Sequence, residues 1–209
     1  MKGTVPLYIL GSSGHAREIA AYAHELNPRQ PVFFVDDRQA GENCVPVSEY
    51  HKRLETGGGE SIMGSGRCEI RRRMLYEIRP PFAVIIHPRA VVLSQVGPGC
   101  VVAPGAVVAP NVLMGPHVLI NYNATIGHDS EVGALSVIAP TAGTGGWCKL
   151  GEAVYVGAGA LIREKLVIGN DAVVAMGAVV TRDVPAGMLA VGMPARCKDK
   201  SSLGGGWFR

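Results

Sequence analysis

The sequence lacks any hydrophobic run long enough to cross a membrane. Its N-terminal apolar segment, Val5–Leu10, is also too short for the core of a signal peptide. Charge of one sign is scarce as well, because the formal net charge is only +3 and no long basic run suggests a nucleic-acid partner. We therefore expect a cytoplasmic protein that binds neither membrane nor nucleic acid.

The sequence also lacks the residue spacings of metal sites. Its five cysteines are scattered and odd in number, which suits a reducing compartment. A three-histidine zinc centre, as some trimeric β-helix proteins carry, needs a pair of close histidines and a third nearby. His117 and His128 are eleven residues apart, and no histidine follows them. We therefore predict no catalytic metal.

What the sequence does contain is an unbroken six-residue repeat from Val96 to Val180. The first residue of each hexad is apolar in fourteen of fifteen cases, and the exception is Thr144. The second residue is Gly or Ala in twelve of the fifteen. A large aliphatic residue followed by a small one at this period fits neither an α-helix nor an alternating strand. The pattern is typical of a parallel β-helix.

Three hexads close one triangular coil of eighteen residues, so this stretch predicts about five coils. Aliphatic side chains stack on their equivalents one coil away, and the small residues let the chain turn each corner without collision. Neighbouring coils are separated by ~4.8 Å, the strand-pairing distance. An ordinary β-sandwich with chance spacing is the alternative, and the unbroken frame disfavours it.

The N-terminal part of the chain predicts a small βαβ domain. A buried strand, Val5–Leu10, leads into the glycine turn Gly11–His15 and then into a helix, Ala16–Leu26. The first N–H groups of such a helix point into the turn, which is the geometry that holds a phosphate. Only the GxxG part of the dinucleotide fingerprint is present, so this motif alone is weak.

A second strand, Val32–Val35, ends in Asp36 and Asp37. An acidic residue about twenty positions after the glycine turn is where a ribose hydroxyl would be held. The alternative is that the two aspartates only turn the chain. A third strand at Ser61–Met63 is followed by another glycine turn, which contains Gly66.

The remaining segments complete the predicted domain plan. We expect a loop with one short helix over Gly41–Glu60 and a helix over Glu69–Ile78, whose Arg71–Arg73 cluster forms a solvated face. Phe82–Ile86 is expected to be the last strand of the N-terminal domain, with the coils beginning near Ala90. The domains are then a Rossmann-like βαβ domain at 1–86, a β-helix at 87–200 and a flexible tail at 201–209.

The eighteen-residue period also predicts a catalytic corner. It places His128 directly beneath Gly146, and Asp129 between Asn111 and Trp147 in the stack. A neutral imidazole beside a bare backbone N–H supplies a general base and an oxyanion donor. Asp129 would orient the ring or stabilise the imidazolium. The alternative is a solvated surface histidine, and that interpretation fits His117, His24 and His51 better.

At this point the sequence resembles a known family, the bacterial nucleotide-sugar acetyltransferases of the hexapeptide-repeat class. The resemblance covers roughly residues 5 to 198, and the glycine–His turn with the Gly-His-Asp corner makes it specific. The family includes bacillosamine-pathway and perosamine N-acetyltransferases and sialic acid O-acetyltransferases of the NeuD type. The motifs that carry it, in order, are Gly11–His15, Asp36–Asp37, Gly66 ahead of Glu69–Arg71, Ile86–Pro88, Ile126–Asp129 and Gly192–Ala195.

The resemblance implies a left-handed β-helix, a homotrimer, acetyl-CoA as donor and a nucleotide-linked amino sugar as acceptor. The positions that match the family's base, its acidic support and the backbone group facing the thioester are His128, Asp129 and Gly146. Those that match nucleotide-sugar contacts are Ser13, Gly14, His15, Asp36, Asp37 and Gly66. Those that match acetyl-CoA contacts are Val137, Gly146, Ala158 and Met176, although Met176 replaces a residue that is often Gly.

The function expected from these residues is acetyl transfer from acetyl-CoA to a sugar amine, with His128 as general base and no covalent acyl-enzyme. Two alternatives stay open at this stage. One is O-acetylation of a sugar hydroxyl, as on sialic acid, by the same histidine. The other is a trimeric scaffold that binds a nucleotide sugar without turning it over.

Overall fold

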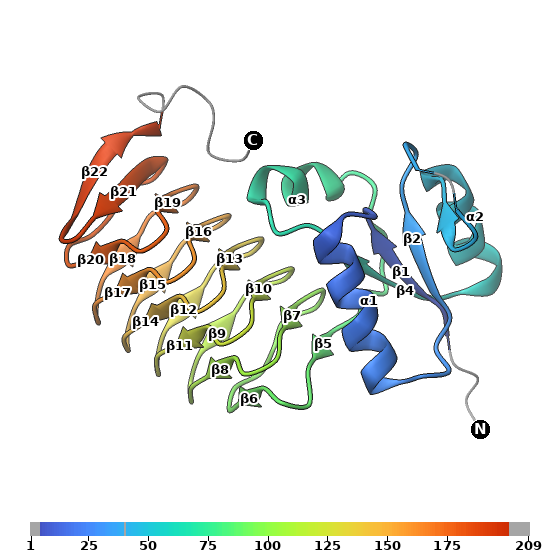
Figure 1. The fold of residues 1–209 in the computed structure, drawn as a ribbon, viewed down its shortest axis with the longest axis horizontal. Helices are drawn as coiled ribbons and strands as arrows, with labels where there is room; N and C mark the ends of the chain where they lie inside the picture. The colour runs from blue at the N-terminus through green and yellow to red at the C-terminus, as the bar shows by residue number, and fades with distance from the viewer. Residues whose placement is uncertain (1–4, 40, 201–209) are drawn as a thin grey trace.

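A computed structural model describes residues 5–39 and 41–200, in two parts that lie against each other (Figure 1). The N-terminal part is a four-stranded parallel sheet in the order β3-β2-β1-β4 with three helices. Its strands are β1 (Leu7–Leu10), β2 (Val32–Val35), β3 (Cys44–Val45) and β4 (Glu60–Met63), and its helices are α1 (Gly14–Leu26), α2 (Val47–Gly57) and α3 (Cys68–Met74).

The sheet forms around β1, whose four residues are all buried. β1 pairs with β2 on one side and with β4 on the other, so that Leu10 lies opposite both Val35 and Met63. The strand order therefore reverses beside β1. In open α/β sheets, ligands bind outside the carboxyl ends of the strands at such a reversal. The turns after β1, β2 and β4 all lie at this edge.

Several local predictions need correction. The stretch Gly41–Glu60 contains the expected helix, the eleven-residue α2, but also the strand β3, which was not predicted. α3 ends at Met74, earlier than the expected Ile78. Arg71, predicted on a solvated face with its neighbours, is fully buried. The helix packs that side against the second part of the molecule, so only Arg72 and Arg73 stay exposed.

The second part is a left-handed β-helix with three flat sides of parallel strands (Figure 1). Side 1 contains β5 (Ile85–Ile86), β7 (Val101–Val102), β10 (Leu119–Ile120), β13 (Val137–Ile138), β16 (Tyr155–Val156), β19 (Val173–Val174), β21 (Met188–Gly192) and β22 (Ala195–Asp199). Side 2 contains β6 (Val91–Val92), β8 (Val107–Val108), β11 (Thr125–Ile126), β14 (Gly143–Thr144), β17 (Leu161–Ile162) and β20 (Val179–Val180). Side 3 contains β9 (Leu113–Met114), β12 (Glu131–Val132), β15 (Lys149–Leu150) and β18 (Val167–Ile168).

The predicted register is observed. Ile120 lies between Val102 and Ile138, eighteen residues away in each direction, and all three side chains are fully buried. The first coil is an exception because it is shorter, and Ile85 pairs with Val101, sixteen residues on. The β-helix therefore begins at β5 rather than near Ala90. Six strands from β5 to β19 stack on side 1, which gives about six coils instead of five.

The corners show why the second hexad position is small. A Cβ added to Gly127 would collide with the backbone of Gly145 and Gly146 in the next coil. The left-handed backbone conformation lies two residues later, at the fourth position of the hexad. It recurs every six residues, and the non-glycine members are Asn111, His117, Asn123, Asp129, Leu135, Thr141, Trp147, Ala153, Lys165 and Asp171.

The two parts are packed together through side 1. One hydrophobic cluster joins β1 and α1 residues such as Ile9 and Ile19 to the outward residues Leu119 and Val137. Arg71 crosses the same junction, donating hydrogen bonds to the carbonyl oxygens of Ser65 (2.7 Å) and His117. The N-terminal domain therefore covers side 1 and leaves sides 2 and 3 free. The predicted tail at 201–209 lies outside the described residues.

Candidate functional site

The corner between sides 2 and 3 brings His128 and Gly146 together. A Cβ built on Gly146 would lie 2.7 Å from Cε1 and 2.8 Å from Nε2 of the His128 ring. Any other residue at position 146 would therefore displace the imidazole. The contact follows from the coil period, because β11 and β14 lie one above the other and carry the two residues at equivalent points of their corners.

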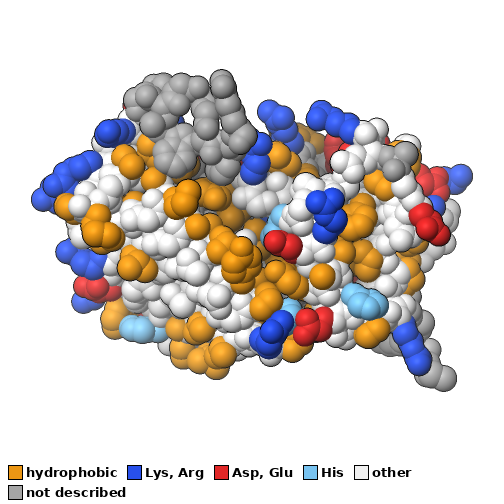
Figure 2. All heavy atoms as spheres, in the orientation of Figure 1, with side chains coloured by type: hydrophobic (Ala, Val, Ile, Leu, Met, Phe, Trp, Pro, Cys, Tyr) orange, Lys and Arg blue, Asp and Glu red, His pale blue; other side chains and the backbone are white. Residues whose placement is uncertain are grey.

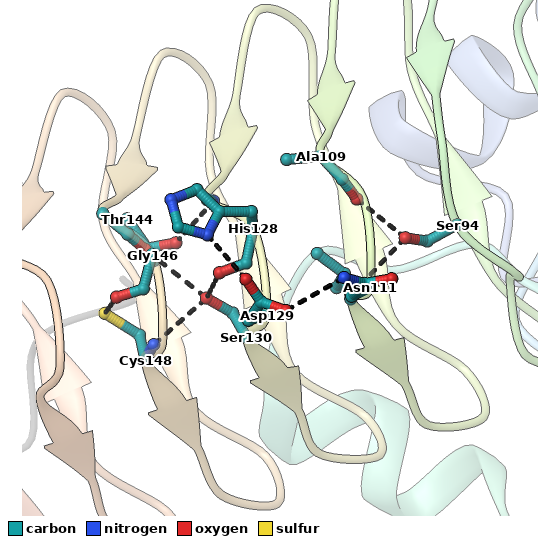
Figure 3. Close-up of polar contacts among 12 residues, drawn as sticks. Ser94, Ala109, Asn111, His128, Asp129, Ser130, Thr144, Gly146 and Cys148 are labelled. Carbon is teal, nitrogen blue, oxygen red and sulfur yellow. Dashed lines mark hydrogen bonds and ion pairs between the residues drawn. The ribbon is translucent and has the colours of Figure 1, made fainter.

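Asp129 fixes the orientation of the His128 ring (Figure 3). Its Oδ2 lies 2.7 Å from Nδ1 of His128, and its Oδ1 accepts a hydrogen bond of 3.0 Å from Asn111 one coil below. These two hydrogen bonds hold the pKa of Asp129 below its ordinary value, so the carboxylate is ionised at neutral pH. With Nδ1 bonded to an anion, Nδ1 carries the proton and Nε2 is left as the basic nitrogen.

The Gly146 N–H is available as a donor. The neighbouring N–H groups of Gly145 and Trp147 donate to the carbonyls of Ile162 and His128. Within residues 5–39 and 41–200, no acceptor lies in hydrogen-bonding position for the Gly146 N–H. A basic nitrogen and a free N–H donor are thus adjacent, which is the pairing that acyl transfer needs.

Trp147 forms one wall of this corner and was not identified from the sequence as a functional residue. Its ring meets the His128 ring edge to face, with centroids 4.4 Å apart and an interplanar angle of 84°. The indole is 51% exposed. Lys165, one coil further on, lies over the other part of the indole at 5.5 Å from the ring centroid. The signal was available in the eighteen-residue spacing of Asp129, Trp147 and Lys165.

The residues predicted to hold a nucleotide sugar lie together at the carboxyl edge of the N-terminal sheet. Ser13 and Gly14 begin α1 beside β1, while Asp36 and Asp37 follow β2, and Gly66 follows β4. Both aspartates already have protein partners. Asp36 accepts a 2.6 Å hydrogen bond from the Ser12 hydroxyl, and Asp37 accepts one from the first N–H of α2. Asp37 therefore also has the structural role that the sequence left open.

His15 is the least satisfied group of this edge. Its Nδ1 lies 3.0 Å from the Glu18 carboxylate, but its Nε2 is buried with no hydrogen-bond partner among the described residues. Burial lowers the pKa of the imidazole, the Glu18 carboxylate partly opposes this, and the Arg71 charge lowers it further. His15 is therefore held neutral, with one ring nitrogen buried and unpartnered among the described residues.

The predicted acetyl-CoA contacts do not converge within one chain. Ala158 and Met176 lie one above the other at the corner between sides 1 and 2, and Met176 is 75% exposed. Gly146 lies at the other end of side 2. The Val137 side chain is only 2% exposed, because it is packed against the N-terminal domain. Of this set, Ala158 and Met176 present side chains that a ligand can reach.

His117 is not the solvated surface histidine that the sequence predicted. It is 5% exposed, with its ring against Phe82 and its Nδ1 directly over Gly99 in the coil below. Burial, followed by the nearby Arg71 charge, lowers its pKa to about 4. His117 is thus a neutral residue of the domain junction. The packing of α3 and Phe82 onto this corner could not be seen in the hexad pattern.

In residues 5–39 and 41–200, no three His, Cys, Asp or Glu side chains lie close enough to hold a metal ion together. None of the helices in this part of the chain has the length and apolar character that a membrane span requires.

Comparison with known proteins places these features in context. Residues 6–78 match the family described as the PglD N-terminal domain. Over most of its length, the chain is similar to the acetyltransferase domain of PglB from Neisseria gonorrhoeae, solved with acetyl coenzyme A. The TM-score is 0.86 and the sequence identity 29%, covering 94% of this chain and 100% of that one.

Two other solved structures are similar over most of the chain. PerB from Caulobacter crescentus, in complex with CoA and GDP-perosamine, gives a TM-score of 0.83 at 28% identity and covers 92% of this chain and 97% of that one. WeeI from Acinetobacter baumannii gives a TM-score of 0.81 at 25% identity and covers 92% and 99%.

The curated relatives match a shorter segment. A 2,3,4,5-tetrahydropyridine-2,6-dicarboxylate N-acetyltransferase of Staphylococcus aureus is 47% identical over 49 residues, which is 23% of this chain. The match spans only 20% of the length of that relative.

Proposed function

We propose that this chain, which belongs to the hexapeptide-repeat sugar acetyltransferases with a PglD-type N-terminal domain, transfers an acetyl group from acetyl-CoA to the amine of a nucleotide-linked amino sugar. The observation that carries the proposal is the contact between His128 and Gly146 beside an ionised Asp129. Similar proteins support the substrates, since the acetyltransferase domain of PglB was solved with acetyl coenzyme A and PerB with CoA and GDP-perosamine.

The reaction is a direct transfer in a ternary complex. The sugar amine attacks the thioester carbonyl carbon while Nε2 of His128 accepts the amine proton. The Gly146 N–H donates to the oxyanion of the tetrahedral intermediate, and Asp129 stabilises the imidazolium. The carbon–sulfur bond then breaks, and the CoA thiolate takes the proton from His128. The products are the N-acetylated sugar and CoA.

A covalent acyl-enzyme is not part of this scheme. The two nucleophile-bearing residues closest in sequence to the corner, Ser130 and Cys148, are both fully buried. Burial raises the pKa of the Cys148 thiol, which disfavours the reactive thiolate. Neither side chain can therefore reach an acetyl group bound outside the corner.

The complete site needs a second protomer. The N-terminal domain covers side 1, whereas His128 lies at the opposite corner of the same chain. Side 2 runs from its corner with side 1 to the corner of His128. It is suited to contact with another copy because the outward residues of its strands carry no charge. These residues are Val91, Val107, Thr125, Gly143, Leu161 and Val179. In Figure 2, Lys and Arg side chains lie at the C-terminal end of the β-helix and over the N-terminal domain.

We therefore propose a homotrimer in which the nucleotide sugar is held at the N-terminal sheet edge of one protomer and faces His128 of the next. The nucleotide-sugar residues are Ser13, Gly14, His15, Asp36, Asp37 and Gly66. Acetyl-CoA lies along the groove between two β-helices, in contact with the exposed corner of Ala158 and Met176.

The test is a thermal-shift panel of UDP-, GDP-, dTDP- and CMP-linked amino sugars and of CMP-sialic acid, followed by acetyl-CoA turnover on each compound that binds. We expect one of the nucleotide-linked amino sugars to bind and to be N-acetylated. His128→Ala should lower kcat by ~10²–10⁴-fold. His24→Ala, which changes an exposed histidine on α1, is the control. Turnover only on a hydroxyl acceptor, or unchanged kcat in His128→Ala, contradicts the proposal.

A further inference from the structure

Interior Ser and Cys residues at the fifth hexad position connect neighbouring coils through a recurring pair of hydrogen bonds, which we call a bracket. The Ser136 hydroxyl donates to the carbonyl of Gly151 (2.9 Å) and accepts from the N–H of Val154 (3.0 Å). The Cys100 thiol makes the equivalent pair, with Gly115 and Val118, at 3.2 Å each.

The bracket at Ser130 is different because it also contacts the catalytic peptide. Its hydroxyl accepts from the N–H of Cys148 (3.1 Å) and lies 3.4 Å from the carbonyl oxygen of Gly145. It also lies 3.5 Å from the carbonyl oxygen of His128 itself (Figure 3). The single proton of this buried hydroxyl can be donated to either carbonyl, so Ser130 connects Cys148 to the Gly145 peptide or to the His128 peptide.

Thr144 makes a second connection on the other side of the same corner. It is the one polar residue at the first hexad position, where the other fourteen are apolar. Its side chain is 8% exposed, and its Oγ1 accepts a hydrogen bond of 3.2 Å from the N–H of Gly127, the residue before His128. Gly127 also donates to the Thr144 carbonyl, at 3.1 Å.

We propose that Ser130 and Thr144 are positioning residues that hold the His128 imidazole in register with the Gly146 N–H. Together they connect the coil of His128 to the coil of Gly146 immediately before and immediately after the corner. The inference rests on the proposed function, since it assigns these residues to the base and oxyanion donor of that reaction.

Such positioning residues are needed because the proposed reaction tolerates little displacement of the base from the oxyanion donor. A base and an oxyanion donor on different coils act together only while the coils keep a fixed separation and phase, and small displacements of reacting groups lower rates steeply. Backbone hydrogen bonds join the two coils at Thr125 and Gly143, from Gly127 to Thr144, and from Trp147 to His128. The side-chain hydrogen bonds of Ser130 and Thr144 reinforce this connection on both sides of His128.

Stability alone does not explain why position 144 is a threonine. Valine has nearly the same shape and would match the apolar pattern of every other first position. A buried hydroxyl is costly to desolvate, whereas the Gly127 N–H would keep the Thr144 carbonyl as a partner without it. Stability alone therefore favours valine at this position, so the threonine is explained better by positioning.

The experiment compares four variants in the full-length protein, assayed with acetyl-CoA and the acceptor found in the panel. Ser130→Ala removes the catalytic bracket, and Ser136→Ala removes an equivalent buried bracket that does not contact the His128 peptide. Thr144→Val removes the second connection while keeping its shape. Ser130→Cys is the rescue variant, because a cysteine makes the same bracket at position 100 in this chain.

We expect Ser130→Ala to lower kcat roughly tenfold, with both KM values within about threefold of wild type. Ser136→Ala should lose a similar amount of thermal stability yet keep kcat within about twofold. Thr144→Val should keep or raise Tm while lowering kcat by roughly three- to tenfold. Ser130→Cys should recover most of the activity lost in Ser130→Ala.

The inference is overturned if Thr144→Val keeps wild-type kcat, or if Ser136→Ala loses as much kcat as Ser130→Ala. Should Ser130→Ala not fold, Thr144→Val and Ser130→Cys decide the question. Hydrogen–deuterium exchange separates this result from a failure of the proposed function. In Ser130→Ala we expect faster exchange of the backbone amide hydrogens at the corner where Gly127 and Cys148 lie, whether or not wild type turns over an amino sugar. An unchanged exchange rate there also overturns the inference.

Discussion

The Asn111 side-chain amide lies one coil below Asp129 and donates a 3.0 Å hydrogen bond to the oxygen that does not face His128. The three residues therefore form a chain from Asn111 through Asp129 to the imidazole. Because both hydrogen bonds stabilise the ionised carboxylate, each contributes to keeping Asp129 charged and in place. Asn111 thus helps to keep the Asp129 carboxylate charged and in place beside His128.

We expect Asn111→Ala to lower kcat by roughly three- to tenfold, because Asp129 loses one of its two fixed partners. The activity loss should be larger at low pH, since the pKa of Asp129 rises toward its ordinary value. Asn123→Ala is the matched control, because Asn123 has the same left-handed backbone conformation at a different corner. Equal activity in the two variants would show that Asn111 has no such role.

Trp147 is expected to restrict the His128 ring. An edge-to-face aromatic contact contributes ~0.5–1.5 kcal/mol, so Trp147→Asn should lower kcat/KM by roughly two- to tenfold. Asparagine tolerates the positive φ of 54° at this position, and we therefore expect no loss of Tm. Lys165→Asn, at an equivalent corner position, leaves the Trp147–His128 contact intact and should keep wild-type kcat/KM. A fully active Trp147→Asn protein would remove Trp147 from the site.

Stability should depend on the protonation of His117. Its pKa of about 4 in the folded protein lies below the ordinary 6.5, so the unfolded chain binds the proton more tightly. The contribution is fully present above pH ~6.5 and is lost as the pH falls toward 4, by about 2–3 kcal/mol in total. The pKa of His15 is also lowered, so its protonation should likewise reduce stability as the pH falls.

Urea denaturation between pH 4 and 7 measures this dependence. His117→Asn should reduce the loss of unfolding free energy at low pH, because asparagine does not titrate. Asparagine also tolerates the φ of 57° at this corner. His24→Asn, on the exposed side of α1, should leave the wild-type slope unchanged. An identical slope in wild type and His117→Asn would refute the assignment.

Arg71 should couple the two domains. Lysine keeps the charge but cannot bridge the carbonyls of Ser65 and His117 as the planar guanidinium does. We expect Arg71→Lys to lower the free energy of unfolding by ~1–3 kcal/mol and to raise KM for the nucleotide sugar, because the turn after β4 loosens. Arg73→Lys, on the exposed face of α3, is the control for both measurements. Wild-type stability in Arg71→Lys would argue against this role.

The β-helix and its register could be predicted from the sequence because the hexad pattern is local and repeats without interruption. The same period predicted that His128 lies beneath Gly146, since a fixed repeat turns sequence separation into spatial position. The N-terminal strands and α1 were also predictable, because each combines an apolar run or helical pattern with a glycine turn. The roles of these residues in catalysis and binding stay predictions.

Several of the errors fall where the two domains meet. Arg71 and His117 each look solvated in their own segment, and only the packing of α3 on side 1 buries them. The start of the β-helix at Ile85 was missed because the first coil is two residues short and so does not fit the frame. Hydrogen bonding by Ser130 and Cys100 was missed because a six-residue pattern records size and polarity, not geometry.

The left-handed residue that recurs at every sixth position limits how such a chain can change its length in evolution. Deleting or inserting one residue between coils would rotate every later side chain to the wrong side of the prism, exchanging interior aliphatics for exposed ones. Only a gain or loss of a whole turn preserves the phase. Variation within the relatives of this protein should therefore accumulate at the termini and by whole-turn duplication, while the separation of eighteen between His128 and Gly146 stays fixed.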